Sequence, residues 1–425
     1  MLCTRFAPSP TGLLHLGNVR TALLSYLWSM NNKGKFILRF DDTDRVEEEY
    51  IKAIRTDLEW MNIKFDKEIF QSERNAIYSK WLEICKEKGI VYPAYETKEE
   101  LDQLREKLSK EKKPPVFKKF NAKQADDTNP HWRFELPSIK IEWNDAIRGK
   151  ISINLKSVSD PIVQKSDGSF TYMLTSVIDD IEEKVSHIFR GEDHVTNTAI
   201  QIYMFERIAN HKVEFGHLPI LLNKGGQRMS KRNKDESIQD LRNEGFSAMT
   251  LANQMLFIGK SEFHLCKTME ELSKYADSQF SSSQIRWSKK EALKLQNKFI
   301  QSLSQNEAHG YFGINFDKWE LIKSEISFKQ DLEDWKKIFE NCDVVSDEKI
   351  NFKELNIDEK IFEFDKMNID WNNFIASIRE LEHGKIVMKK MRSILTGKKF
   401  GPSMIELLEN IDIKILKHRF YASIA

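Results

Sequence analysis

The order of the first predicted elements constrains the fold of this chain more than any other feature. Residues 3–7 lean apolar and residues 35–40 read K-F-I-L-R-F, so both segments are predicted to be strands. Apolar residues recur at helical spacing from Val19 to Trp28, and a second helix is expected over residues 46–62. A strand–helix–strand–helix order begins a parallel sheet, so the sequence predicts an α/β fold.

Size and composition place further bounds on function. With 425 residues, the chain is long enough for about three domains. Lys and Arg total 66 against 65 Asp and Glu, so the overall charge predicts no polyanionic partner. The four cysteines form no Cys-x-x-Cys pair, so we expect no zinc site and a reducing, cytoplasmic location. No signal core and no run of 18 apolar residues occurs, so no membrane span is expected.

The rest of the chain divides into two regions of different pattern. Short β-like runs predict strands at 131–136, 151–155 and 171–178, and the α/β pattern resumes near residues 188–190. From about residue 240 the sequence reads as helical to its end, with helices expected at 289–303 and 372–382. We therefore expect an α/β part followed by an all-α part.

Two segments are locally basic. Between Arg105 and Lys119 there are seven basic residues and two acidic ones, which favours either a solvated helix and loop or a contact with a phosphate backbone. Residues 385–399 hold basic residues and no acid, whereas residues 331–370 are acidic. Any polyanion contact in the C-terminal half is therefore expected at 385–399.

A loop after the first strand carries the first candidate site. It reads P-S-P-T-G-L-L-H-L-G-N over residues 8–18 and ends in the first predicted helix. In open α/β sheets, ligands bind at the carboxyl ends of strands, near helix N-termini. Gly17 would let a ligand approach the backbone, and His15 could donate to a phosphate oxygen. By itself this pattern is equally consistent with a capped turn.

Two later segments carry charge suited to anions. Residues 227–232 read Q-R-M-S-K-R, so three cations could clamp a triphosphate or simply face solvent. In I-F-R-G-E-D-H over residues 188–194, Arg190 could bind a carboxylate bidentately or belong to a surface ion-pair cluster. No G-x-x-x-x-G-K-S/T and no G-x-G-x-x-G occurs, so P-loop NTPases and dinucleotide-dependent dehydrogenases lack support.

Together, and in this order, these segments resemble the class I aminoacyl-tRNA synthetases. His15–Asn18 (H-L-G-N) resembles the "HIGH" motif, and Arg228–Arg232 (R-M-S-K-R) resembles "KMSKS". The opening R-F-A-P-S-P-T-G is similar to the glutamyl and glutaminyl branch. The likeness covers nearly the whole chain and includes D-D-T-D-R at 41–45, Q-S-E-R at 71–74, D-G-S-F-T-Y at 167–172 and Asp179-Asp180. L-T-G at 395–397 and G-P at 401–402 resemble the last domain of bacterial glutamyl enzymes.

The resemblance implies an architecture. It predicts a Rossmann-like catalytic domain over 1–95 and 176–225, split by an α/β acceptor-arm-binding insertion over 96–175. A stem-contact domain with the KMSKS-like loop is expected over 226–300, and an α-helical anticodon-binding domain over 301–425. Glutaminyl and archaeal-type enzymes end in β-barrels, which the helical pattern here does not resemble. We expect the protein to be a monomer that binds tRNA and does not bind a membrane.

The resemblance also implies a two-step reaction, in which ATP and L-glutamate form glutamyl-adenylate and the glutamyl group then moves to tRNA. His15 and Lys231 are the expected catalytic residues. The ATP-binding residues it implies are Pro8, Thr11, His15, Gly17, Asn18, Asp193, Arg228, Ser230 and Lys231. Those implied for glutamate are Arg5, Ser9, Asp41, Tyr172 and Arg190, and the lysines expected to contact tRNA are Lys112, Lys113, Lys118 and Lys119.

The chain departs from the family pattern at three places. Arg228 stands where the motif begins with Lys, and Asp41 stands where glutamate is common. Some relatives carry a cysteine-rich zinc site in the insertion, whereas residues 95–120 have no cysteine. We therefore expect Mg²⁺ as a companion of ATP, and no zinc.

Three alternatives remain to be separated. A relative could charge glutamine tRNA with glutamate by the same chemistry. A truncated paralogue that glutamylates a modified tRNA base would lack the 125 residues after position 300. A tRNA-binding module with an inactive site is disfavoured because His15, Gly17, Ser230 and Lys231 are all present.

Overall fold

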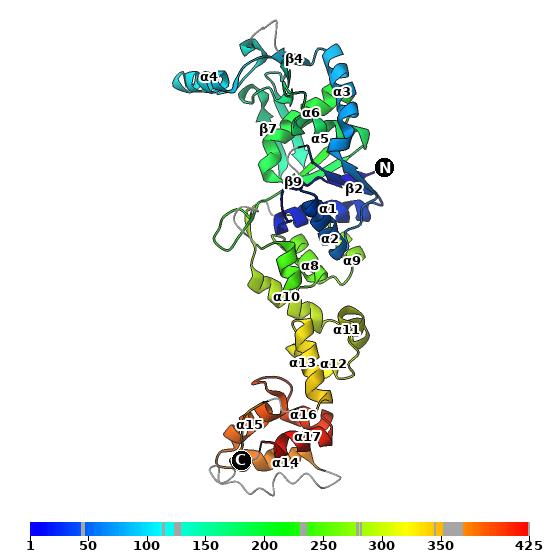
Figure 1. Ribbon diagram of the computed structural model, residues 1–425, viewed down its shortest axis with the longest axis vertical. Helices are drawn as coiled ribbons and strands as arrows, with labels where there is room; N and C mark the ends of the chain where they lie inside the picture. Colours follow the sequence, from blue (N-terminus) through cyan, green and yellow to red (C-terminus); the bar gives the residue numbers. More distant parts are fainter. Residues whose placement is uncertain are drawn as a thin grey trace. The chain divides into compact units, whose positions relative to one another are not determined.

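The computed structural model describes residues 1–43, 47–112, 115–122, 129–229, 236–277, 280, 283–343, 346–351 and 369–423. The chain forms two compact units, Met1–Lys289 and Lys290–Ala425. Each unit is described by itself, with the elements labelled as in Figure 1.

Five parallel strands form the central sheet of the first unit, in the order β10-β9-β1-β2-β3. They are β1 Cys3–Phe6, β2 Lys35–Phe40, β3 Lys67–Phe70, β9 His187–Gly191 and β10 Glu214–Leu218. All four residues of β1 are buried, as expected for a central parallel strand that is covered on both faces. The predicted α/β fold is therefore confirmed.

Helices cover this sheet and join distant parts of the unit. They are α1 Leu16–Asn31, α2 Glu48–Trp60, α3 Asn75–Glu87, α5 Tyr172–Glu182 and α6 Val195–Ala209. Helix α1 packs on β1 and also on α8 Ala248–Phe257 and α9 Met269–Ser273 (Figure 1). Helix α1 thus links the central sheet to helices that come much later in the sequence.

A second layer of β-structure lies between α3 and α5 in sequence. Its antiparallel sheet contains β4 Val91–Ala94, β5 His131–Phe134 and β8 Ile162–Gln164. The hairpin of β6 Lys140–Asp145 and β7 Gly149–Asn154 packs against β10 and α6. Helix α4 Lys98–Lys110 begins with a capping box between Thr97 and Glu100. The small sheet begins at Val91.

One predicted strand is wrong. The structure places a helix, α5, over most of residues 171–178. Val177 and Ile178 are β-branched and suggested a strand, but Leu174, Val177, Ile178 and Ile181 recur at helical spacing. That apolar stripe packs against α3 and α6, so burial of one helix face decides the local structure.

The remaining described elements are mainly helical. In the first unit, β11 Leu221–Leu222 pairs with β12 Ile285–Arg286, and α7 spans Ile238–Asn243. The second unit begins at Lys290, within α10 Lys289–Gln301. It continues with α11 Gln305–Phe312, α12 Trp319–Ile322, α13 Lys329–Glu340, α14 Trp371–Glu380, α15 Gly384–Thr396, α16 Met404–Asn410 and α17 Ile413–Tyr421. Within the described residues, no helix is long and apolar enough to cross a membrane.

Candidate active site

A cavity of about 510 Å³ opens at the carboxyl end of the central sheet. Its lining includes Pro8 and Ser9 after β1, Asp41 after β2, Asp193 after β9 and Pro219 after β10. Strands β2 and β3 lie on one side of β1, whereas β9 and β10 lie on the other. The loops after β1 and β9 therefore diverge, and open α/β sheets bind ligands at this switch point.

The cavity brings together every described residue that the sequence predicted for ATP and glutamate. These are Arg5, Pro8, Ser9, Thr11, His15, Gly17, Asn18, Asp41, Tyr172, Arg190, Asp193 and Arg228. Ser230 and Lys231 lie outside the described residues. The individual assignments to ATP or glutamate stay predictions.

His15 is the N-cap residue of α1 and is oriented by the backbone of the same helix. Its Nδ1 accepts a hydrogen bond of 3.1 Å from the amide of Gly17. A neutral imidazole that accepts at Nδ1 carries its proton on Nε2, so Nε2–H is the donor. Since helix N-termini attract anions, this end of α1 is suited to phosphate oxygens.

Gly17 is required by the same geometry. A Cβ at this position would lie 2.9 Å from Cε1 of His15 and 3.0 Å from Nδ1. The glycine therefore allows the imidazole to lie against the first turn of α1.

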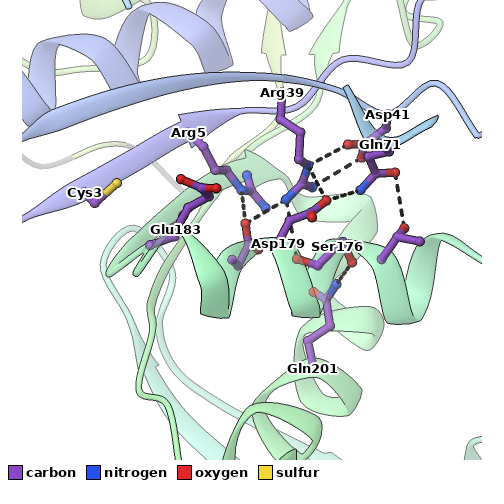
Figure 2. Close-up of polar contacts among 12 residues, drawn as sticks. Cys3, Arg5, Arg39, Asp41, Gln71, Ser176, Asp179, Glu183 and Gln201 are labelled. Carbon is purple, nitrogen blue, oxygen red and sulfur yellow. Dashed lines mark hydrogen bonds and ion pairs between the residues drawn. The ribbon is translucent and has the colours of Figure 1, made fainter. Parts of the chain in front are cut away.

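Arg39, which sequence reasoning missed, is the centre of a buried ion-pair cluster (Figure 2). Its Nε lies 2.7 Å from Oδ1 of Asp41, and its Nη1 lies 2.8 Å from Oδ1 of Asp180. Nε of Arg5 approaches the same oxygen of Asp180 at 3.4 Å. Asp179 accepts from Gln71 at 2.7 Å on the side of the cluster nearest α3. The cluster holds Arg5 and Asp41 at the cavity wall.

Burial and ion pairing oppose each other in this cluster. Burial raises the pKa of Asp41, and the Arg39 guanidinium only partly offsets that effect. For Arg39, burial acts to lower the pKa, but Asp41, Asp180 and Asp179 outweigh it and raise the pKa well above its ordinary value. Arg39 therefore stays charged, and Asp41 depends on it to be an anion.

Arg190 differs from Arg39 because, among the described residues, it has no carboxylate within ion-pair distance. Its guanidinium donates to the hydroxyl of Tyr172 at 3.3 Å, to Thr198 at 2.6 Å and to Gln201 at 2.7 Å. Its Nε is buried and has no hydrogen-bond partner in the described part of the chain. Burial lowers the pKa of Arg190. A buried cation held only by neutral groups is well suited to an external carboxylate.

Asp193 and Arg228 join the loop after β9 to the hairpin of residues 221–229, whose last residues begin the KMSKS-like segment. Nη2 of Arg228 lies 2.8 Å from Oδ2 of Asp193. Burial acts to raise the pKa of Asp193, but the hydrogen bond from Arg228 and the neighbouring His194 outweigh it, so the pKa is lowered. Arg228 bridges back to Leu222, which fixes the start of this hairpin at the cavity.

The lysines predicted to contact tRNA have different surroundings. Lys112 is exposed, and Lys119 is exposed and pairs with Glu135. Lys113 lies outside the described residues. Lys118 contradicts the prediction of a surface phosphate contact, because it is only 7% exposed and its Nζ lies 3.0 Å from Asp160. Burying a lysine without such a carboxylate is costly, so the pair explains its place in the core.

The residues that the structure describes do not form a metal centre. No group of three or more His, Cys, Asp or Glu side chains comes together there with the spacing of a metal site.

Comparisons with known proteins agree with this geometry. Residues 1–295 match the family "tRNA synthetases class I (E and Q), catalytic domain". The chain is 37% identical to a glutamate–tRNA ligase of Bartonella bacilliformis, over 96% of this chain and 97% of that one. It is 35% identical to one of Bartonella henselae, over 96% of each chain.

A solved structure has the same overall fold. A glutamate tRNA ligase from Elizabethkingia meningosepticum, crystallised in complex with its amino acid, superposes with a TM-score of 0.81. It is 26% identical and covers 99% of both chains. Full-length relatives, the catalytic-domain match and the cavity at the switch point lead to one conclusion: the chain belongs to the glutamate–tRNA ligases, a family of class I aminoacyl-tRNA synthetases.

Proposed function

We propose that this protein attaches L-glutamate to tRNA(Glu) in two ATP-dependent steps. In the first, the α-carboxylate of glutamate attacks the α-phosphorus of ATP, forming glutamyl-adenylate and releasing pyrophosphate. In the second, a ribose hydroxyl of the terminal adenosine of tRNA attacks the acyl carbon, and AMP leaves. Neither step needs a protein nucleophile, so positioning and charge stabilisation lower the barrier.

Arg190 is the observation that carries the proposal. Glutamate brings two carboxylates and one ammonium group, and a site for it needs cations that are not already neutralised. Arg190 is buried at the cavity with no described acid as a partner, and Arg5 lies beside it with one long contact to Asp180. Asp41 supplies an acid on the same wall for the ammonium group. This charge pattern suits a dicarboxylic amino acid.

Other residues of the same lining suit ATP. His15 lies at the N-terminus of α1 with its proton on Nε2, and the Asp193–Arg228 pair also lines the cavity. We propose that His15 donates to the phosphates, and that Ser230 and Lys231 close over the triphosphate. ATP would enter with Mg²⁺ on its phosphates, since this ion keeps several waters and binds substrate phosphate oxygens.

A charging assay tests the proposal. Purified full-length protein would be incubated with ATP, Mg²⁺, labelled L-glutamate and either tRNA(Glu) or tRNA(Gln). We expect glutamyl-tRNA(Glu), with L-glutamine and L-aspartate inactive. Charging of tRNA(Gln) alone would replace the proposed substrate by the alternative, and no charging of either tRNA would contradict the proposal.

A further inference from the structure

A buried chain of hydrogen bonds runs from the β6–β7 hairpin to the Arg190 guanidinium. Asp145, the last residue of β6, accepts from Nδ1 of His217 in β10. Nε2 of His217 lies 2.8 Å from Oγ1 of Thr198 in α6, and that oxygen accepts from Nη2 of Arg190 at 2.6 Å. Asp145 and His217 have fully buried side chains, and Thr198 is also inaccessible. Four separate elements thus converge behind the cavity.

The direction of these bonds follows from Asp145. Its Oδ1 accepts the backbone amides of His217, Ile147 and Arg148 at 3.0 to 3.1 Å. Burial alone would raise the pKa of Asp145, but the hydrogen bonds from His217 and the other amides lower it to about 2. Asp145 is therefore an anion and must receive the proton on Nδ1 of His217.

The remaining protons follow in order. Burial lowers the pKa of His217, so the imidazole is neutral and its Nε2 is an acceptor. The Thr198 hydroxyl then donates to His217 across 2.8 Å, which is shorter than its 3.2 Å approach to the carbonyl of His194. With its hydrogen directed to His217, the Thr198 oxygen turns its lone pairs toward Arg190.

We propose that His217 and Thr198 are positioning residues, which orient Arg190 for a carboxylate of the substrate without neutralising its charge. The inference rests on the proposed use of glutamate. An acid in direct contact with Arg190 would compete with the substrate, whereas a hydroxyl fixes the guanidinium and leaves its charge available. Gln201 accepts from the same Nη2 at 2.7 Å, so both acceptors act on one nitrogen and set the direction of the partnerless Nε.

Thr198→Val tests this role because it removes the hydroxyl and keeps the shape of the side chain. Hydrogen bonds to charged groups contribute about 1.5–3 kcal/mol, so we expect the glutamate KM to rise at least about tenfold. The ATP KM and kcat should change by less than about threefold, because the hydrogen bonds of the Thr198 hydroxyl reach Arg190, His194 and His217 and not the residues proposed to hold ATP. Thr198→Ser restores the hydroxyl and should bring the glutamate KM back to within about threefold of the parent.

Thr250→Val is the matched control. Thr250 is also fully buried in the first unit, and its hydroxyl accepts from Ser247 at 2.9 Å, but it does not line the cavity. Its loss should leave the glutamate KM unchanged, which separates positioning of Arg190 from a general loss of packing. Melting temperatures of all variants would be compared in parallel.

A second variant keeps the test open if Thr198→Val does not fold. His217→Asn keeps a donor toward Asp145 and withdraws the acceptor from Thr198, so it should raise the glutamate KM in the same way. The dissociation constant for L-glutamate, measured by calorimetry, gives a readout that does not need charging. Parent protein that binds glutamate but charges no tRNA would contradict the proposed function alone. Equal glutamate affinity in the parent, Thr198→Val and His217→Asn would overturn the positioning role.

Discussion

The amide of Gly17 donates to Nδ1 of His15 at 3.1 Å, and the two residues are so close that no side chain fits between them. A methyl group on residue 17 would lie 2.9 Å from Cε1 of His15. Gly17→Ala must therefore displace the imidazole. We expect the rate of tRNA-dependent ATP–pyrophosphate exchange to fall by about tenfold or more, because the displaced His15 would no longer be positioned to donate to the phosphates.

Gly310→Ala is the control for this substitution. Gly310 lies in α11 of the second unit, and a Cβ there would meet no atom within 4 Å. Activity should be unchanged. An exchange rate for Gly17→Ala equal to that of Gly310→Ala would show that displacing His15 has no effect on the chemistry.

Arg190→Lys should weaken glutamate use while leaving a positive charge in place. One ammonium group cannot reproduce the planar guanidinium that reaches Tyr172, Thr198 and Gln201 together. We expect the glutamate KM to rise by roughly tenfold to a hundredfold, as for a lost charge-assisted contact. Arg55→Lys changes an exposed pair with Glu68 and serves as the control. An unaltered glutamate KM and kcat would refute the assignment of Arg190.

Lys231→Ala should reduce adenylate formation by roughly two to three orders of magnitude, the scale for one key donor to a developing charge. Lys231 lies outside the described residues, and the expectation rests on its place in the KMSKS-like segment. Lys224→Ala removes an exposed lysine from the hairpin just before it and should have little effect. Unchanged ATP–pyrophosphate exchange in Lys231→Ala would remove this residue from the mechanism.

Lys112 and Lys118 should respond differently to loss of charge. Lys118→Met leaves Asp160 buried beside Tyr92 without its cation, so we expect a loss of stability of about 3–5 kcal/mol. Lys112→Glu reverses an exposed charge and should leave the melting temperature nearly unchanged. If the surface around Lys112 contacts tRNA, Lys112→Glu should weaken tRNA binding, and the loss of affinity should be largest at low salt. If Lys112→Glu does not change tRNA affinity at any salt concentration, the segment is a solvated surface and not a tRNA contact.

The first strands were predictable because their signals are local. Residues 35–40 form β2 as expected, and a Pro/Gly-rich loop separates β1 from α1. The R-F-A-P-S-P-T-G and "HIGH"-like segments lie in one stretch between β1 and α1, and residues after β2 and β9 join them in one cavity, since the loops after parallel strands meet at one edge of a sheet. The family resemblance thus named residues that line one cavity, while their assignment to ATP or glutamate stays a prediction.

The ion-pair cluster was not predictable from local pattern. Arg39 lies in an apolar strand, and although Asp41 is only two residues away, its other close partner, Asp180, is 141 residues away. The nearby sequence therefore does not indicate the whole cluster. The same limit explains α5, in which β-branched residues suggested a strand while packing on α3 and α6 favoured a helix. Lys118 looked like part of a basic surface because its acid, Asp160, comes 42 residues later.

Asp57 should make the stability of the first unit depend on pH. It lies in α2 with a side chain only 2% exposed, and its Oδ1 is 3.6 Å from Nη1 of Arg242. Burial raises its pKa to about 6, and Arg242 only partly offsets this. Because the folded state holds the proton more tightly than the unfolded state, stability falls as pH rises from about 4 to 6 and stays lower above that range. Asp57→Asn removes this pH-dependent loss of stability. For a shift of about two pKa units, the free energy of unfolding should rise by at most about 3 kcal/mol. We expect a higher melting temperature than the parent at pH 7 and no gain near pH 4, whereas Asp102→Asn, at an exposed position, should show no such difference. A gain of equal size at both pH values would contradict titration of Asp57 as its cause.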